Sequence, residues 1–322
     1  MREAGSGDRL PISLGLARHM VDTDRGVGVG ASRPSISMIV PTRDSSSGVR
    51  RLLNSVPNDE YSMLQVVLND DPRSRDRIEE IAEEFRVRGM DIVVARTNTA
   101  MAVGRREGAR LAVGEILLHL DSDMTVSPQL LSELREMFGA NADAAVVPEI
   151  GVGQGFWARC KALEKRCAQG DVRLESLRAV RASVYWGVGG HDRELVWGED
   201  KDLDLRVRRT GAQVLRTAGW VVHFESALSP LVAAKKKGQY AATAGLFAAK
   251  HPHAFRSQRS PIRIARLLGR AVLDQSGEVW LVPGLLLVKS CEYLAVGVVL
   301  ARRRAARFRR TLRVSLVSKR WR

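Results

Sequence analysis

The feature that most constrains the fold is a regular alternation of short apolar stretches with amphipathic stretches between residues 35 and 123. Each apolar stretch has the length of a strand, and the stretches between them repeat apolar residues at helical spacing. The expected strands are 36–40, 64–68, 91–95 and 116–120, and the expected helices are 48–56, 74–88 and 104–113. Strands that alternate with helices in this way predict an α/β fold with a mostly parallel sheet.

Acidic residues follow several of the expected strands directly. They are Asp44, Asp70, Asp71, Asp121 and Asp123. In an open parallel sheet the ligand crevice lies at the carboxyl ends of the strands. Packing does not explain carboxylates gathered at these ends, so the sequence predicts a polar binding site there.

The charge of the chain is distributed unevenly. The 322 residues include 51 Lys and Arg and 36 Asp and Glu, for a net charge of +15. Residues 1–225 carry 31 basic and 33 acidic groups, whereas residues 226–322 carry 20 basic and 3 acidic groups. The basic character therefore belongs to the C-terminal region, which predicts an anionic partner there.

The C-terminal region also contains a long apolar stretch. Residues 279–301 hold only two charged side chains, Lys289 and Glu292, and residues 302–322 then add ten basic groups and no acidic one. We expect a helix lying at a membrane interface, because Pro283 and the two charges disfavour a spanning or re-entrant helix. A core helix is the third alternative. The basic run suits the anionic cytoplasmic leaflet, and nucleic acid is not an expected partner because no zinc-finger, helix-turn-helix or RNP motif is present.

Composition also indicates the cellular compartment of the protein and the character of its N-terminal segment. Residues 1–33 are rich in Gly, Ser, Arg and Asp without sustained periodicity, and we expect a mobile segment with no secretory signal. None of the three cysteines, Cys160, Cys167 and Cys291, belongs to a CxxC pair. This excludes a disulfide framework and a zinc ribbon, and it fits a reducing, cytoplasmic location.

The tripeptide Asp121-Ser122-Asp123 follows a strand that is expected to be buried. Hard oxygen ligands at alternate positions can hold Mg²⁺ or Mn²⁺ and leave coordination positions for diphosphate oxygens. The same tripeptide occurs on solvated loops, but its place at a strand end favours a metal site. His223 ends a further apolar run, and it either packs structurally or supplies an imidazole nitrogen, which suits Mn²⁺.

A second acidic group opens an expected helix at residues 198–206. Acidic residues are favourable at a helix N-terminus, and this role accounts for Asp202 and Asp204. For Asp200 we predict a general base that deprotonates an acceptor hydroxyl during an in-line displacement. Trp186 and Trp197 flank this region and either pack in the core or form an apolar platform for an acceptor sugar or lipid.

The motifs, taken in order, resemble those of family 2 glycosyltransferases of the GT-A fold over residues 35–225. They are Ile39-Val40-Pro41-Thr42-Arg43, Asn69-Asp70-Asp71 with Ser74 and Asp76, Gly104-Arg105-Arg106-Glu107-Gly108-Ala109, Asp121-Ser122-Asp123, Gly189-Gly190-His191-Asp192 and Gly198-Glu199-Asp200. The resemblance implies a Rossmann-like nucleotide-diphospho-sugar transferase domain. We therefore expect a mobile segment at 1–33, a catalytic domain at 34–225 and a basic, apolar helical, membrane-interfacial region at 226–322.

The resemblance also implies how the donor nucleotide is bound. Pro41, Thr42 and Arg43 would line the nucleotide pocket, and either Asp70 or Asp71 would hydrogen-bond the base. The usual Asp-Asp-Gly-Ser loop reads Asn-Asp-Asp-Pro-Arg-Ser here, so the choice between the two aspartates stays open.

The remaining roles follow from the same resemblance. Arg105 would reach the base or the diphosphate, and Asp121 would face the ribose or the sugar. Asp123 would hold the metal, with His223 as a further metal or diphosphate ligand. The usual Arg-Asn pair reads Arg105-Arg106, and the second arginine either contacts the diphosphate or is solvated.

The expected activity is an inverting, metal-dependent transfer of a sugar to an acceptor hydroxyl, with Asp200 as the base and Glu199 beside it contacting acceptor or donor. The expected cofactor is Mn²⁺ or Mg²⁺, and the expected donor is a UDP-sugar, with GDP- and dTDP-sugars as alternatives. A lipid-linked or envelope glycan is the expected acceptor, and the inner face of the cell membrane the expected place of peripheral attachment. The alternatives are a soluble transferase acting on a small molecule or peptide, and a non-catalytic basic scaffold on a degenerate GT-A fold.

Overall fold

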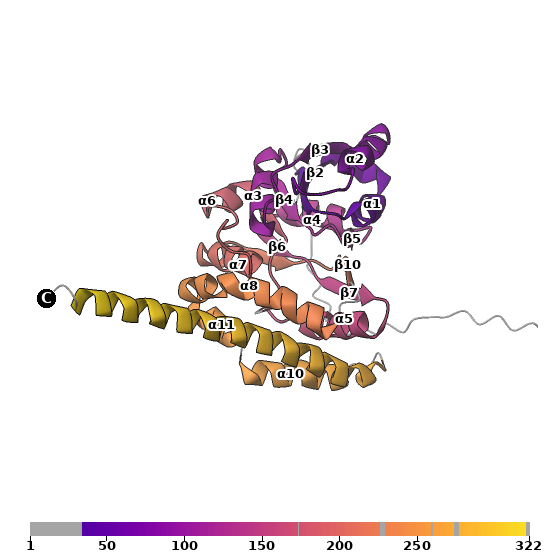
Figure 1. The fold of residues 1–322 in the computed structure, drawn as a ribbon. Helices are drawn as coiled ribbons and strands as arrows, with labels where there is room; N and C mark the ends of the chain where they lie inside the picture. Colours follow the sequence, from indigo (N-terminus) through magenta and orange to yellow (C-terminus); the bar gives the residue numbers. More distant parts are fainter. Residues whose placement is uncertain (1–33, 173, 226–228, 259, 274–276, 320–322) are drawn as a thin grey trace, which may run out of the picture. The chain divides into compact units, whose positions relative to one another are not determined.

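A computed structural model describes residues 34–172, 174–225, 229–258, 260–273 and 277–319 of the chain. The N-terminal segment predicted at residues 1–33 lies outside the described residues. From residue 34 onward the described residues belong to one compact unit. The elements of this unit are shown in Figure 1.

The central sheet has seven strands in the order β3-β2-β1-β4-β8-β6-β9. Four of its six strand pairings are parallel, and β8 runs antiparallel to both of its neighbours. The predicted α/β fold with a mostly parallel sheet is therefore confirmed. The strands are β1 (Ile36–Thr42), β2 (Leu64–Asp70), β3 (Asp91–Ala95), β4 (Ile116–His119), β6 (Ala144–Val146), β8 (Ala179–Arg181) and β9 (Val214–Arg216).

The strands at the centre of this sheet are apolar on both faces because helices cover both. Along β1, Met38 and Val40 face one apolar cluster, whereas Ile39 between them faces another. The covering helices are α1 (Ser46–Asn54), α2 (Ile78–Val87), α3 (Met101–Leu111), α4 (Leu130–Gly139), α6 (Ala182–Gly187) and α7 (Glu199–Arg209), with a 3₁₀ helix at Asn58–Met63.

One predicted helix begins later than its apolar pattern suggests. Helix α2 starts at Ile78 rather than at residue 74, because the preceding residues are used to hold the loop after β1. The Ser74 hydroxyl accepts a hydrogen bond from the Asp44 amide (3.2 Å), and the Asp76 carboxylate accepts one from the Ser46 amide (2.6 Å). These side chains therefore fix the turn that follows β1, at the edge of the sheet where the strand-end aspartates lie.

A second, three-stranded sheet lies beside the first in the order β5-β10-β7. Its strands are β5 (Met124–Val126), β7 (Glu149–Gly153) and β10 (Val221–Glu225). Strand β10 pairs antiparallel with β5, and His223 lies opposite Met124 in this register. Because Met124 follows Asp123 directly, the pairing brings His223 next to the predicted metal-binding aspartate.

The chain after residue 229 is helical wherever it is described, apart from short connections. Its helices are α8 (Pro230–Lys250), α9 (Pro252–Gln258), α10 (Pro261–Leu273), a 3₁₀ turn at Val279–Leu281 and α11 (Val282–Lys319). Helix α11 packs against α8 and against α5 (Phe156–Ala168), and α10 also packs on α5 (Figure 1). An apolar cluster that includes Cys160, Leu163 and Leu285 joins α5 to α11.

One described helical segment, Val279–Val299, is long and apolar enough to cross a membrane by length and composition. Only 22% of its most apolar window is buried within the protein. Most of its residues are therefore exposed or half-buried, and a smaller part is buried within the protein.

Candidate functional site

The first part of the site lies where β1 and β2 end side by side. The Thr42 hydroxyl donates a hydrogen bond to Asp70 Oδ1 (2.8 Å), and the Thr42 carbonyl accepts one from the Asp71 amide (2.9 Å). Asp70 is fully buried, and burial raises the pKa of its carboxyl group. Its second oxygen, Oδ2, has no hydrogen-bond partner among the described residues. Pro41 lies next to this pair in β1, opposite Asn69.

The neighbouring Asp71 is already paired. Arg73 donates to both of its carboxylate oxygens (2.9 and 2.7 Å), and these hydrogen bonds lower the pKa of Asp71 to about 2. Arg43, whose side chain is 54% exposed, lies 3.6 Å from the same carboxylate. The structure therefore separates the two candidates for the nucleotide base: Asp71 is occupied by arginine, whereas Asp70 keeps an unpartnered oxygen.

Arg105, on α3, forms the centre of the site. Its Nη1 donates to Glu199 Oε1 (2.8 Å) and Asp200 Oδ1 (2.6 Å), and its Nη2 donates to Asp121 Oδ1 (2.6 Å). The side chain is only 2% exposed, and the surrounding carboxylates raise the pKa of the guanidinium although burial opposes this. In this structure Arg105 joins the carboxylate at the end of β4 to the two carboxylates that open α7.

The two adjacent carboxylates at the start of α7 have different environments. Asp200 is 34% exposed at its side chain, and Arg105 and His191 lower its pKa. Glu199 is buried, and burial together with the charge of Asp200 raises its pKa. Gly198, the residue before them, adopts a left-handed conformation (φ 78°) that glycine accommodates without steric cost. The pair therefore offers one ionised carboxylate beside one that takes up a proton readily.

His191 orients Asp200 from a second direction. Its Nε2 lies 3.3 Å from Asp200 Oδ1, and its Nδ1 lies 3.0 Å from the Tyr185 hydroxyl. His191 also packs edge-on against His119, with 4.7 Å between ring centroids. Burial lowers the pKa of both histidines, so the imidazole rings are neutral here.

The Arg106 guanidinium contacts neighbouring protein groups; it is neither simply solvated nor directed into an open crevice. It donates to the carbonyl oxygens of Gly189 and His191, the latter at 3.1 Å, and lies over the Trp186 ring. Gly189 and Gly190 have φ values of 84° and 66°, which side-chain-bearing residues rarely adopt. Arg106 therefore fixes the glycine loop that carries His191, a role that the sequence did not indicate.

The predicted metal ligands come together at the junction of the two sheets. Asp121, Asp123 and His223 each offer one ligand atom, and these atoms all lie within 4.8 Å of one another. His223 Nε2 lies 3.2 Å from Asp123 Oδ2, while its Nδ1 lies 2.6 Å from Glu149 Oε1. These two carboxylates raise the pKa of His223 to about 9. The two carboxylates suit either Mg²⁺ or Mn²⁺, whereas the imidazole nitrogen favours Mn²⁺ over the harder Mg²⁺.

Sequence analysis missed the group that supports His223. Glu149 accepts from Arg178 Nη2 (2.6 Å) and from Lys165, which also contacts His223. Glu149, His223 and Glu225 form a second group of potential ligands within 4.8 Å. Only the folded chain shows the support of His223, because Glu149 comes from β7, Lys165 from α5 and Arg178 from the segment before β8.

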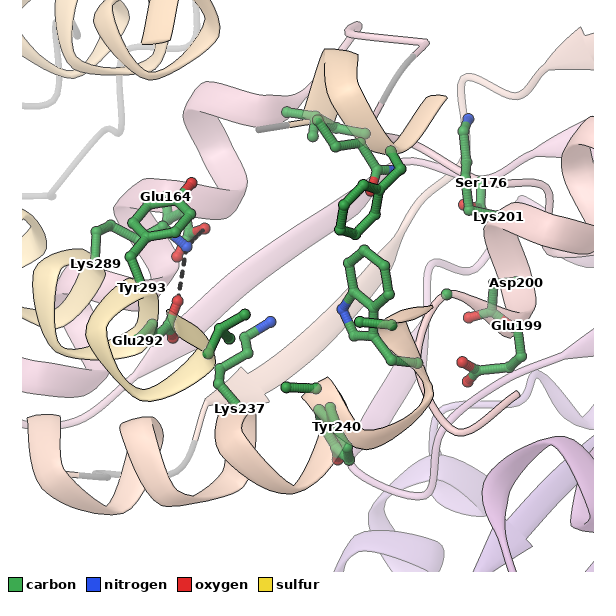
Figure 2. A pocket seen from close by; sticks show the side chains of 18 residues that line it. Glu164, Ser176, Glu199, Asp200, Lys201, Lys237, Tyr240, Lys289, Glu292 and Tyr293 are labelled. Atoms are coloured by element: carbon green, nitrogen blue, oxygen red, sulfur yellow. Dashed lines mark hydrogen bonds and ion pairs between the residues drawn. The ribbon is translucent and has the colours of Figure 1, made fainter. Parts of the chain in front are cut away.

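Two cavities meet at Asp200. One, of about 310 Å³, lies on the side of Glu149, Lys165 and Arg178, and the other, of about 380 Å³, lies between the start of α7 and helices α8, α9 and α11. Figure 2 shows Glu199 and Asp200 on one side of the larger cavity and Lys289 and Glu292 on the other. Asp200 therefore lines both cavities.

A family model described as glycosyl transferase family 2 matches residues 37–187. Residues 37–187 thus match the model of a family 2 glycosyltransferase domain. This confirms the resemblance that the ordered motifs indicate. The match ends before α7, so Glu199, Asp200 and His223 lie outside the matched residues and are brought to this place only by the contacts described above.

Two relatives from Mycobacterium tuberculosis, strains CDC 1551 / Oshkosh and ATCC 25618 / H37Rv, are both named pre-mycofactocin glycosyltransferase. Each is 27% identical over 266 residues, which cover 76% of this chain and 54% of the relative. The chain thus spans about half the length of these curated relatives.

Among solved structures, this chain is similar to S. aureus TarS, with a TM-score of 0.48 and 17% identity over 82% of this chain and 54% of that chain. TarS 1–349 in complex with UDP-GlcNAc has a TM-score of 0.46 and 18% identity, covering 84% of this chain and 92% of that chain.

Proposed function

We propose that this chain is a glycosyltransferase that moves a sugar from a nucleotide-diphosphate sugar to an acceptor hydroxyl with inversion at the anomeric carbon. The observation that carries the proposal is the cluster around Arg105. It holds Asp121, from the end of β4, next to Glu199 and Asp200, from the start of α7. The family 2 domain supplies the class of reaction, and this cluster supplies the groups that perform it.

Asp200 is the proposed general base. It is ionised, reaches both cavities and is held in place by Arg105 and His191. A carboxylate with a lowered pKa is a weak base, but the acceptor O–H becomes strongly acidic as its oxygen bonds to the anomeric carbon. The proton then passes to the Asp200 carboxylate while the nucleoside diphosphate leaves. Such general-base assistance contributes about 10²–10⁴ in rate, and a single displacement inverts the centre without an enzyme nucleophile.

The ends of β1 and β2 are the proposed nucleotide site. The unpartnered Asp70 Oδ2 offers a hydrogen-bond acceptor for an imide N–H of uracil or thymine, or for the N–H groups of guanine. Thr42 fixes the carboxylate that carries it. The half-exposed Arg43 is the cation at this edge that could contact the diphosphate. We propose a UDP-sugar as donor, and GDP- and dTDP-sugars are the alternatives.

Asp121, Asp123 and His223 are the proposed holders of Mn²⁺ or Mg²⁺. A divalent ion bound there supplies a Lewis acid that stabilises the negative charge of the departing diphosphate. Glu149 accepts at the His223 Nδ1 and directs Nε2 toward Asp123. Such an outer partner sets the tautomer and orientation of a metal-ligating histidine.

The direct test is donor binding by isothermal titration calorimetry with UDP-, GDP- and dTDP-sugars, with and without Mn²⁺ or Mg²⁺. We expect one nucleotide class to bind, and we expect Asp123→Ala to abolish the metal-dependent part of the affinity. Asp91→Ala, which removes an exposed carboxylate at the start of β3, is the matched control and should bind as the wild type does. Absence of binding to every donor with either metal would favour the non-catalytic scaffold instead.

We also propose that helices α10 and α11 attach the protein peripherally to the inner face of the cell membrane. Exposed apolar side chains lie along both helices, including Leu273 (80% exposed) and Leu294 (69%). The two charges in the apolar segment do not face outward: Lys289 contacts Glu164 of α5 (2.6 Å), and Glu292 contacts Lys161 of α5 (3.2 Å). Because a helix of the catalytic unit pairs with these charges, an interfacial position fits better than a spanning one.

Sedimentation with vesicles of phosphatidylcholine and phosphatidylglycerol tests this attachment. The double variant Leu287→Ser with Leu294→Ser removes two exposed apolar side chains from one face of α11 and should release the protein from the vesicles. The control Val87→Ser changes a more exposed apolar residue (81%) on α2 and should bind as the wild type does. Equal binding of all three proteins would contradict attachment through this face.

For the acceptor we propose a lipid-linked or envelope glycan, in keeping with the apolar face. A soluble acceptor is the second candidate, because the curated relatives are named for pre-mycofactocin. A chain that binds donor but no vesicles, and that transfers sugar to pre-mycofactocin, would establish the second candidate over the first.

A further inference from the structure

The larger cavity beside Asp200 is built mostly by the C-terminal helices. Its volume of about 380 Å³ is at the small end of the range for pockets that bind small molecules. The cavity is lined by residues from α5, the start of α7, α8, α9 and α11, which include Glu164, Trp197, Asp200, Lys237, Tyr240, Phe255, Lys289, Glu292 and Tyr293 (Figure 2). It therefore connects the proposed base to a part of the chain outside the family 2 match.

Most of the charged groups at the far end of this cavity compensate one another. Lys289 contacts Glu164 (2.6 Å) and Glu292 (2.8 Å), and Lys161 contacts the same two carboxylates (2.6 and 3.2 Å). Two cations and two anions thus form a closed network. It leaves no net charge for a ligand to neutralise.

Lys237 is the exception. It extends from α8 into the cavity, between the Lys289 network and the carboxylates of α7 (Figure 2). Its ammonium group makes no ion pair or hydrogen bond with any of the residues that the structure describes. Burial and the nearby Lys289 and Lys161 lower the pKa of Lys237, although Glu292 and Glu164 oppose this. A partly buried ammonium without a partner is costly, and an anionic ligand would remove that cost.

Aromatic side chains form much of the remaining wall. Trp197, Tyr240, Phe255 and Tyr293 all line the cavity. Trp197 is fixed by edge-on contacts to Phe247 and Phe255, with centroid distances of 5.2 and 6.1 Å. Fixed aromatic rings offer flat faces on which an aromatic or sugar ring can pack.

We propose that this cavity is the acceptor pocket and that it takes a ring-bearing acceptor with an anionic group, which pairs with Lys237 while the acceptor hydroxyl lies at Asp200. This inference rests on the proposed glycosyltransferase function and specifies its acceptor. A sugar phosphate of a lipid-linked acceptor and an anionic soluble ring compound share this chemistry. Both combine a ring for the aromatic wall with a negative charge for Lys237.

Calorimetric titration of the full chain, without donor or metal, tests the pocket. The probes are glucose 1-phosphate and phenyl phosphate, with methyl glucoside and phenol as their neutral counterparts. The proteins are the wild type, Lys237→Met and the control Lys236→Met, which removes an exposed lysine from the same helix. We expect Lys237→Met to weaken binding of at least one phosphate probe by about tenfold or more, as for loss of a charged hydrogen bond.

The relative affinities of the two phosphates identify the source of the acceptor. Tighter binding of glucose 1-phosphate indicates a sugar phosphate, and tighter binding of phenyl phosphate indicates an aromatic compound. The proposal is overturned if the neutral probes bind as tightly as the anionic ones, if neither phosphate binds, or if Lys236→Met weakens binding as much as Lys237→Met. Phosphate can also bind the arginines of the donor site. The proposal is therefore judged by the difference in phosphate affinity between the wild type and Lys237→Met.

Thermal unfolding separates a ligand-binding lysine from a structural one. If Lys237 is an uncompensated cation, Lys237→Met melts at or above the wild-type temperature in the absence of ligand, and only the wild type gains stability from phenyl phosphate or glucose 1-phosphate. A variant that melts well below the wild type would show a structural role and overturn the proposal. These titrations contain no donor, so they test the acceptor pocket independently of donor binding. If the phosphate probes fail to bind, the proposed donor site is unaffected. If no donor binds, the titrations still show whether Lys237 binds an anion.

Discussion

Arg105→Met is the substitution that tests the architecture of the site most severely. The side chain is 2% exposed and holds three carboxylates, so methionine would keep most of the apolar contacts while leaving Asp121, Glu199 and Asp200 without their shared cation. Removing one partner from a buried ion pair costs about 3–5 kcal/mol. This is a large part of the roughly 5–15 kcal/mol that stabilises a typical domain.

The sign of the pH dependence follows from the same carboxylates. In the wild type, Arg105 lowers the pKa of Asp200, and the resulting stability is present above the unfolded pKa and lost as pH falls through the folded one. Without Arg105, burial and mutual repulsion raise the carboxylate pKa values, so the free energy of unfolding falls further as pH rises. The loss in Arg105→Met should therefore be larger at pH 8 than at pH 5.

Urea unfolding followed by circular dichroism at pH 5 and pH 8 measures this difference. Arg106→Met is the matched control, because the Arg106 guanidinium donates to carbonyl oxygens rather than to carboxylates. Its effect on the free energy of unfolding should not depend on pH in this range. A loss below about 1 kcal/mol for Arg105→Met, or the same pH dependence in both variants, would refute the role assigned to Arg105.

Three further predictions concern the start of α7. Glu199→Gln removes a carboxyl with a raised pKa, so the wild type should lose stability relative to this variant as pH rises from 5 to 8 in urea unfolding. Gly198→Ala should lower stability by about 1–2 kcal/mol because of its positive φ, whereas Gly245→Ala, in α8 with open space around it, should raise stability by about 0.5–1 kcal/mol in the same assay. His191→Phe should move the acidic limb of the pH–rate profile to higher pH, because His191 lowers the pKa of Asp200; an unchanged profile would contradict this.

The central strands could be predicted because burial on both sides makes them continuously apolar. The predicted strand at 91–95 coincides with β3, and the other predicted strands overlap β1, β2 and β4. Helix α2 was predicted to begin too early because Ser74 and Asp76 bond to the backbone near α1 instead of continuing the helix. The amphipathic pattern of a sequence does not show when side chains before a helix bond to another segment instead of joining the helix.

The metal candidates show what sequence reasoning could and could not provide. The position of Asp123 after a buried strand is a local property that the sequence displays. Its contact with His223 depends on pairing between β5 and β10, which lie about a hundred residues apart and are short. Short strands carry too little periodicity to predict such a pairing, and the supporting group of Glu149, Lys165 and Arg178 was missed for the same reason.

The environment of Arg105 could not be predicted either. Arginine is rarely buried unless it is paired, and its motif suggested a side chain that faces the ligand. Its partners lie 16, 94 and 95 residues away in the chain, so only the fold reveals them. Likewise, the basic composition of the C-terminal region predicted an anionic partner, but only the packing of α11 against α8 and α5 shows that Lys237 has no counter-ion among the described residues.

The most direct test of the central claim is nucleoside diphosphate release from the donor that binds, compared between the wild type and Asp200→Asn with water or acceptor present. If Asp200 is the general base, release by Asp200→Asn falls by about 10²–10⁴ while its affinity for the donor, measured by calorimetry, stays at the wild-type value. Release by Asp200→Asn at the wild-type rate would contradict the assignment and the mechanism built on it.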